Sequence, residues 1–169
     1  MIETATGDIL ATNVEALVNT INCVGISGRG IALQFRNAFP ANFKAYEAAC
    51  KRGEVQPGRM FVFGTGQPTN PRFIINFPTK RHWRDKSRLE DIDSGLEALV
   101  LEVRQRGIQY IAIPALGCGL GGLRWSDVHP KIEGAFAALS NVRALLFEPS
   151  PRPAATAMVR STEVSARDR

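Results

Sequence analysis

The sequence lacks the marks of a membrane-spanning, secreted or metal-binding protein. No segment approaches about eighteen consecutive apolar residues, and the first residues, MIETATGDIL, have no basic region before an apolar run. The three cysteines are scattered, form no CxxC pair and make no metal-like cluster with His82 and His129. We therefore expect a cytoplasmic protein with no membrane contact, no metal and no cofactor.

What the sequence does have is the composition of one soluble globular domain. Its 169 residues are enough to bury a core, and 44% of them are hydrophobic while 22% are charged. The formal net charge is +5, which mildly favours an anionic partner such as a nucleotide or a nucleic acid. Nothing in the sequence indicates assembly, so a monomer is the default expectation.

Apolar runs with strand character alternate with helical patterns along residues 1–148. After a short first strand and the turn TGDIL, strands are expected at 14–21, 60–63, 73–77, 109–113 and 142–147. Helices are expected at 31–39, 41–50 and 126–139, and from a capping box at Ser87 to a stop at Gly107. This alternation predicts an α/β fold with a sheet covered on both faces. Residues 149–169 are rich in Pro, Ala, Ser and Arg without an apolar period, and we expect a disordered tail there.

Two glycine-rich segments follow predicted strands. The first loop, residues 23–30, reads CVGISGRG, and the main loop, residues 114–125, reads PALGCGLGGLRW with four glycines in six positions. Glycines between a strand and a helix allow the backbone amides to approach and hold a phosphate. The alternative is that the glycines serve only tight turns.

The main loop is neither of two familiar phosphate-binding motifs. Gly117, Gly119 and Gly122 fit G-x-G-x-x-G, but too little chain follows them to build a dinucleotide-binding half, and no Gly-Lys-Ser/Thr closes a P-loop. Asn19, Thr20 and Asn22 end the strand before the first loop, where they could bond sugar hydroxyls or position a water.

At this point the motifs match a known family. TGDIL, NTIN followed by GISGRGIALQF, and IPALGCGLGGLRW together resemble the macrodomain, which binds ADP-ribose. The segment NFPTKRHWR resembles the branch of the terminal ADP-ribose protein glycohydrolase, and within it the DarG-type DNA ADP-ribosyl glycohydrolases. Those are bacterial antitoxins paired with a DNA ADP-ribosyltransferase toxin. The resemblance covers residues 1–148 and implies a three-layer α/β/α macrodomain with a mixed central sheet.

The resemblance also implies which residues bind ADP-ribose. Asp8 would accept from the adenine amino group, the main loop would bind the diphosphate, and the first loop would close over the distal ribose. The residues expected to bind ADP-ribose on this basis are Asp8, Ile9, Asn19, Thr20, Gly28, Gly30, Ile31, Ala32, Thr79, Gly117, Cys118, Gly119, Leu120 and Gly121.

The catalytic residue implied by the resemblance is Lys80, with Asn22 beside the distal ribose. Without the family match, Lys80 would be interpreted as a solvated loop lysine. A lysine with a pKa lowered by burial or cationic neighbours could attack C1″ of the distal ribose, and Arg81 and Arg84, near in sequence, could supply such neighbours. The alternative is acid–base or electrostatic support while water attacks. The enzyme that names the branch has an acidic residue in its main loop, whereas GCGLGGLRW has none.

The segment KRHWRDKSR, residues 80–88, has five Lys or Arg residues and could contact DNA through Arg81, Trp83 and Arg84. The alternative is a solvated basic loop. The implied function is removal of mono-ADP-ribose from DNA bases, thymine in this family, on single-stranded DNA. The alternatives are an ADP-ribose reader without turnover, or a hydrolase of protein-linked ADP-ribose or O-acetyl-ADP-ribose. The resemblance further implies that a full-length antitoxin carries a carboxyl-terminal domain that contacts the toxin. The expected tail of about 21 residues is too short to be that domain, so either the chain is an excised macrodomain or the partner surface lies elsewhere.

Overall fold

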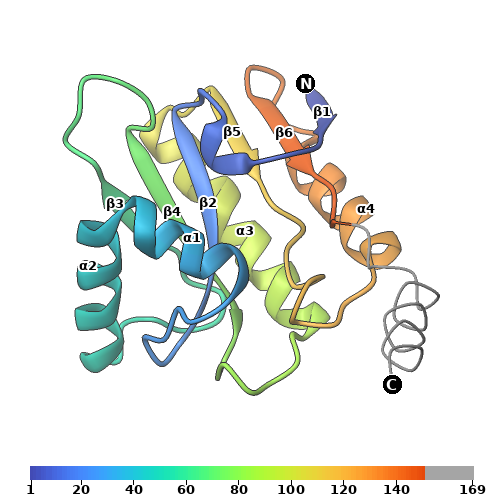
Figure 1. Cartoon of the computed structure of the whole chain (residues 1–169). Coiled ribbons are helices and arrows are strands. Elements are labelled where there is room, and N and C mark those ends of the chain that lie inside the picture. Colours follow the sequence, from blue (N-terminus) through green and yellow to red (C-terminus); the bar gives the residue numbers. More distant parts are fainter. Residues whose placement is uncertain (151–169) are drawn as a thin grey trace, which may run out of the picture.

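A six-stranded sheet with the strand order β1-β6-β5-β2-β4-β3 forms the middle of the computed structural model, which describes residues 1–150 (Figure 1). The strands are β1 (Ile2–Ala5), β2 (Ala16–Asn22), β3 (Phe61–Gly64), β4 (Phe73–Lys80), β5 (Tyr110–Ile113) and β6 (Arg143–Phe147). Every neighbouring pair is parallel except β3 with β4, so the sheet is mixed, as predicted. Nearly all of the expected tail lies outside the described residues.

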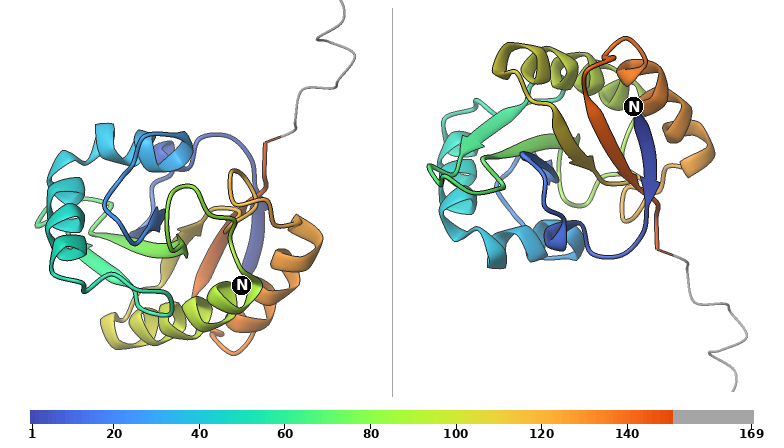
Figure 2. Two further views of the ribbon diagram at one scale, coloured as in Figure 1. Left: turned by 90° about the horizontal axis from the view of Figure 1, so that it is seen from below. Right: turned by 90° about the horizontal axis from the view of Figure 1, so that it is seen from above.

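Helices cover both faces of this sheet. Two of them, α1 (Gly30–Ala38) and α2 (Pro40–Lys51), lie on one face, and α3 (Leu89–Arg106) and α4 (Trp125–Phe136) lie on the other (Figure 2). A short 3₁₀ turn, η1 (Ile9–Ala11), follows β1. The largest core cluster fills the space between the sheet and the α3–α4 layer, and two smaller ones lie under α1 and α2. The three-layer α/β/α prediction is therefore confirmed.

The topology brings three loops to one edge of the sheet. Strands β2, β4 and β5 are parallel neighbours, so their carboxyl ends point the same way. The first loop, the segment 81–88 and the main loop follow these three strands, and all three lie at the lower end of the sheet in Figure 1. In open α/β sheets, ligands bind outside the carboxyl ends of the strands, so this edge is the expected location of a site.

Strand β4 extends beyond its predicted end at Phe77. Pro78 cannot donate to a sheet ladder, yet β4 continues through it to Lys80, next to β2. Lys80 is consequently the last residue of a strand. Its backbone is held by sheet pairing opposite Asn22, unlike that of a solvated loop lysine.

The predicted capping box at Ser87 is wrong. Helix α3 begins at Leu89, Arg88 occupies the capping position, and no side chain caps the helix. The N–H of Ser87 instead donates to the carbonyl of Gly121 in the main loop, at 3.0 Å. Ser87 therefore binds the main loop and does not cap α3, although its local sequence matches a helix cap. The predicted stop at Gly107 is confirmed, with φ of +64°.

No helix in residues 1–150 is long and apolar enough to cross a membrane. In the same residues, no three or more His, Cys, Asp or Glu side chains are grouped so that they could hold a metal ion. The three cysteines are free thiols.

Candidate functional site

The main loop presents free backbone amides. Hydrogen bonds from Gly122 N to Gly119 O, at 3.2 Å, and from Leu123 N to Gly117 O, at 2.9 Å, fold the loop back on itself. Gly117 and Gly122 have φ of +72° and +78°, which a residue with a side chain rarely adopts. Within the described part of the chain, the N–H groups of residues 119–121 donate to no acceptor. Consecutive unpaired amides of this kind form a concavity that favours an anion.

The amino-terminal end of α1 adds to this arrangement. The helix begins at Gly30, and Arg29 in the capping position gives no side-chain cap, so among residues 1–150 no side chain caps its first N–H groups, which are available to an anion. A Cβ placed on Gly30 would lie 3.8 Å from Cδ1 of Leu120. The first loop and the main loop therefore meet.

Asn22 braces the first loop. Its Nδ2 donates to Ile26 O at 2.7 Å, and its Oδ1 accepts from Val24 N at 3.1 Å and from the Tyr46 hydroxyl at 2.8 Å. The same hydroxyl lies 2.8 Å from the Asn22 carbonyl oxygen. The Asn22 oxygen is thus fully used inside the protein, and the geometry gives Asn22 a structural role in shaping the loop beside Lys80.

Lys80 lies at the end of β4 with its Nζ 3.5 Å from the carbonyl oxygen of Trp83. Its pKa is held below the ordinary lysine value, first by burial and then by the positive charges of Lys86 and Arg29, while the Asp85 carboxylate opposes the shift. A lysine whose pKa is lowered has a larger neutral fraction at neutral pH, and the neutral amine is the nucleophilic form.

Arg81 and Arg84 contact other groups, and neither is among the charges that shift the pKa of Lys80, which are Lys86, Asp85 and Arg29. The Arg81 guanidinium binds the buried Asp91 carboxylate through two contacts of 3.2 Å. Arg84 lies over the ring of Trp83, 4.5 Å from its centroid. The Trp83 side chain itself remains 44% exposed.

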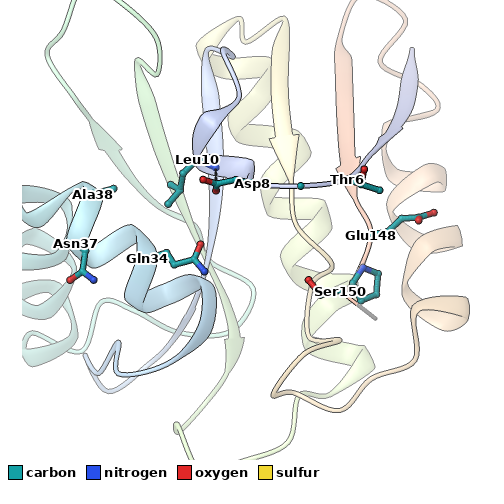
Figure 3. Close-up of a pocket in the computed structure, with 10 residues that line it drawn as sticks. Thr6, Asp8, Leu10, Gln34, Asn37, Ala38, Glu148 and Ser150 are labelled. Carbon is teal, nitrogen blue, oxygen red and sulfur yellow. Dashed lines mark hydrogen bonds between the residues drawn. The ribbon is translucent and has the colours of Figure 1, made fainter. Parts of the chain in front are cut away.

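A pocket of about 1010 Å³ is lined by the segment around η1, by α1 and by the segment after β6 (Figure 3). Its lining includes Asp8 before η1, Gln34 and Asn37 of α1, and Glu148 after β6. The Asp8 carboxylate caps η1 by accepting from Leu10 N at 2.9 Å, yet it stays exposed to the pocket. Lys80 lies outside this pocket, at the carboxyl end of β4.

Some predicted contact residues are not brought to this site. Asn19 is buried and donates to Asn76 Oδ1 at 3.1 Å, and Asn76 in turn bonds Asn42 of α2. Ile9 is buried in the core cluster under α1, and Thr79 is buried in β4. Three other predicted contacts have different surroundings: Thr20 is half-buried in β2, Cys118 is buried in the main loop and Leu120 is 55% exposed. Gly28 is exposed, whereas Ile31 and Ala32 are half-buried at the start of α1.

Sequence reasoning missed the roles of Tyr46, Lys86, Ser87 and Arg29. Tyr46 has the spacing of a core residue of its helix, and its partner Asn22 is 24 residues away. Lys86 and Ser87 lie in a segment noted only for its overall charge and its resemblance to a helix cap. No signal in the sequence distinguished Lys86 from the other cations of that segment.

Comparison with known proteins identifies the fold. The model of the Macro domain family matches residues 18–132. The chain belongs to the macrodomain family. A solved macrodomain of Mycobacterium tuberculosis DarG shares 53% identity with it and superposes with a TM-score of 0.88, covering 89% of this chain and 99% of that one.

Two curated relatives extend this comparison. A Mycobacterium tuberculosis protein named DNA ADP-ribosyl glycohydrolase is 53% identical over 150 residues, which are 89% of this chain and 43% of that protein. A Thermosipho africanus protein, named a DNA ADP-ribosyl transferase–DNA ADP-ribosyl glycohydrolase fusion, is 33% identical and is matched over 73% of this chain and 36% of its own length. The macrodomain thus spans less than half of each relative. The predicted resemblance to the DarG-type macrodomains is confirmed.

Proposed function

We propose that this macrodomain is a glycohydrolase that removes mono-ADP-ribose from DNA bases, with thymine as the modified base and Lys80 as the catalytic residue. The observation that carries the proposal is the setting of Lys80. It is a partly buried lysine with a lowered pKa, at the sheet edge that also carries the free amides of the main loop and of α1. The name of the Mycobacterium tuberculosis relative supports the substrate class.

The reaction breaks the bond between C1″ of the distal ribose and the base nitrogen. The bonding electrons leave with the base, which takes up a proton, and the oxygen of water ends on C1″. The positive charge that develops on the ribose is met by a neutral amine or by a water. Lys80 serves this step either by attacking C1″ and being released by water, or by exchanging the proton while water attacks.

The rest of the ligand is bound along the same edge. Amides of the main loop and of α1 hold the diphosphate, and Asp8 accepts from the adenine amino group in the pocket of Figure 3. These residues bind and orient the substrate. Holding the diphosphate and adenine fixed brings C1″ toward Lys80, so that binding energy is used for orientation.

Trp83 and Arg84 are proposed to contact the DNA strand. The half-exposed Trp83 ring can stack on a base, and the Arg84 guanidinium over it can reach a phosphate. Arg81 is less suited to this role than predicted, because Asp91 holds its guanidinium.

In the full-length protein we propose a DNA ADP-ribosyltransferase toxin as partner. The support is the Thermosipho africanus relative, whose name joins a DNA ADP-ribosyl transferase with a glycohydrolase in one chain.

The test of the proposal is turnover by wild type and by Lys80→Ala of single-stranded DNA that carries ADP-ribose on thymine. We expect wild type to release free ADP-ribose and the variant to release none while still binding ADP-ribose. Lys44→Ala, an exposed lysine on α2, is the matched control and should act like wild type. If wild type leaves the DNA intact, or if Lys80→Ala clears it as fast, the proposal fails.

The same assay separates the alternatives. A wild-type protein that binds ADP-ribose but releases none from any substrate is a reader without turnover. A glutamate-linked ADP-ribosyl peptide and O-acetyl-ADP-ribose, offered in parallel, should be cleaved far more slowly than the DNA. Reduction with borohydride during turnover would trap an imine between Lys80 and the opened ribose, and mass spectrometry would locate it.

A further inference from the structure

The segment that follows Lys80 is docked on the main loop. Ser87 N donates to Gly121 O at 3.0 Å, and the Ser87 side chain packs against both Gly117 and Gly121. The Ser87 side chain is buried. These contacts fix the position of the neighbouring residue Lys86 relative to the loop.

The Lys86 side chain lies directly against the end of the main loop. Its Cδ and Nζ are 3.3 Å and 3.4 Å from the position that a Cβ on Gly122 would occupy. The absence of a side chain at Gly122 therefore leaves the space in which the lysine stem and its ammonium rest. The ammonium therefore lies beside Gly122, the residue that directly follows the unpaired amides of residues 119–121 in the described chain.

Lys86 has no anionic partner inside the described protein. Within residues 1–150 it forms no salt bridge, whereas Arg81 and Arg124 in the same region are paired with carboxylates. It lies close enough to Lys80 to help lower the pKa of that lysine. An ammonium without a counter-ion, beside a row of unpaired amides, is a favourable setting for a phosphate.

We propose that Lys86 is a phosphate-binding residue of this site and that it adds a cation to the anion-binding amides of the main loop. This inference rests on the proposed function, because the phosphate belongs to its substrate. The phosphate is either the diphosphate of ADP-ribose or the backbone phosphate next to the modified nucleotide. Both present the same oxygen acceptors to the ammonium.

The experiment compares Lys86→Gln, Lys86→Arg and the control Lys44→Gln, which removes the same charge from an exposed lysine on α2. Each change is made in the Lys80→Ala protein, so that the substrate stays intact. Binding is measured for three ligands: ADP-ribose, the ADP-ribosylated nucleoside without backbone phosphates, and the ADP-ribosylated oligonucleotide. Thermal unfolding of each variant verifies that it is folded.

If Lys86 binds the diphosphate, Lys86→Gln should bind all three ligands about 10-fold more weakly, and Lys86→Arg should restore most of the affinity. If it binds a backbone phosphate, only the oligonucleotide should lose about 10-fold, and the loss should shrink as salt is raised. If Lys86→Gln binds every ligand as tightly as Lys44→Gln does, the inference is overturned.

The two proposals can fail separately. A wild-type protein that cleaves none of its substrates ends the proposed glycohydrolase function, while the binding comparison still decides the role of Lys86. A Lys80→Ala protein that binds none of the three ligands overturns both.

Discussion

Substituting Gly121 by alanine should distort the backbone of the main loop and weaken ADP-ribose binding. A Cβ at this position would lie 2.2 Å from Ser87 Oγ and 2.5 Å from the carbonyl oxygen of Gly117. Such contacts essentially never come closer than 3.0 Å, so the carbonyl must move by about 0.5 Å at least. Because Gly117 accepts the bond from Leu123 N that folds the loop, this movement disturbs the orientation of the free amides.

The magnitude follows from the cost of overpacking. Forcing an extra methyl into a well-packed site costs about 1–3 kcal/mol. If the loop bears this cost only when the ligand is bound, the affinity for ADP-ribose should fall about 5- to 140-fold, since each 1.4 kcal/mol is about tenfold. Titration calorimetry with ADP-ribose measures the loss, and single-turnover release from ADP-ribosylated DNA should fall with it.

The matched control is Gly134→Ala in α4, where an added Cβ meets nothing within 4 Å. It should leave ADP-ribose binding unchanged. Adding Ser87→Ala to Gly121→Ala should not restore binding, because the contact with the Gly117 carbonyl remains. Gly121→Ala that binds ADP-ribose within twofold of wild type, or rescue by Ser87→Ala, would refute the reasoning.

Three other predictions concern the support of the site. Tyr46→Phe removes the hydroxyl that bonds Asn22, so the free energy of unfolding should fall by about 1–3 kcal/mol and ADP-ribose should bind more weakly; urea unfolding that matches wild type would contradict this. Gly95→Ala would place a Cβ 2.3 Å from the Phe77 ring, and thermal unfolding should occur at a clearly lower temperature. Burial lowers the pKa of Lys80 in the folded protein. At pH values between this lowered pKa and the ordinary lysine pKa, the unfolded chain binds more protons than the folded protein, so the free energy of unfolding rises with pH. Lys80→Met should remove this rise, which urea unfolding at pH 7 and pH 10 measures. If the free energies of unfolding of wild type and Lys80→Met differ by the same amount at both pH values, the prediction is contradicted.

The fold could be predicted because its signals are local. The strand expected at 14–21 has no regular alternation of apolar and polar residues, and β2 is indeed buried on both faces between parallel neighbours. Glycines after strands marked the first and main loops. Parallel strands then force both loops to one edge, so the approximate location of the site follows from chain order alone.

The details of the site depend on contacts between distant residues, which have no local signal. Asn19 has the sequence character of a ligand contact, yet its amide is used to bond Asn76, 57 residues away. The Tyr46 hydroxyl and Asn22 meet only because α2 packs beside β2. Arg81 and Lys86 are both cations of one basic segment. Only the fold decides that Asp91 binds Arg81, whereas Lys86 lies near Lys80 and forms no salt bridge with any of residues 1–150.

The missing carboxylate of the main loop has a steric cause in this structure. A side chain at Gly121 would collide with Ser87 and with the Gly117 carbonyl, so an acidic residue there requires a different packing of the segment after β4. The pKa of Lys80 is lowered first by burial, and the charges that shift it further are Lys86 and Asp85 of its own segment and Arg29 before α1. Lys86 and Asp85 shift the pKa of Lys80 in opposite directions. In the pH dependence of turnover, Lys86→Gln should therefore raise the apparent pKa that belongs to Lys80, and Asp85→Asn should lower it. Shifts of the same sign in the two variants would show that these charges do not act through Lys80.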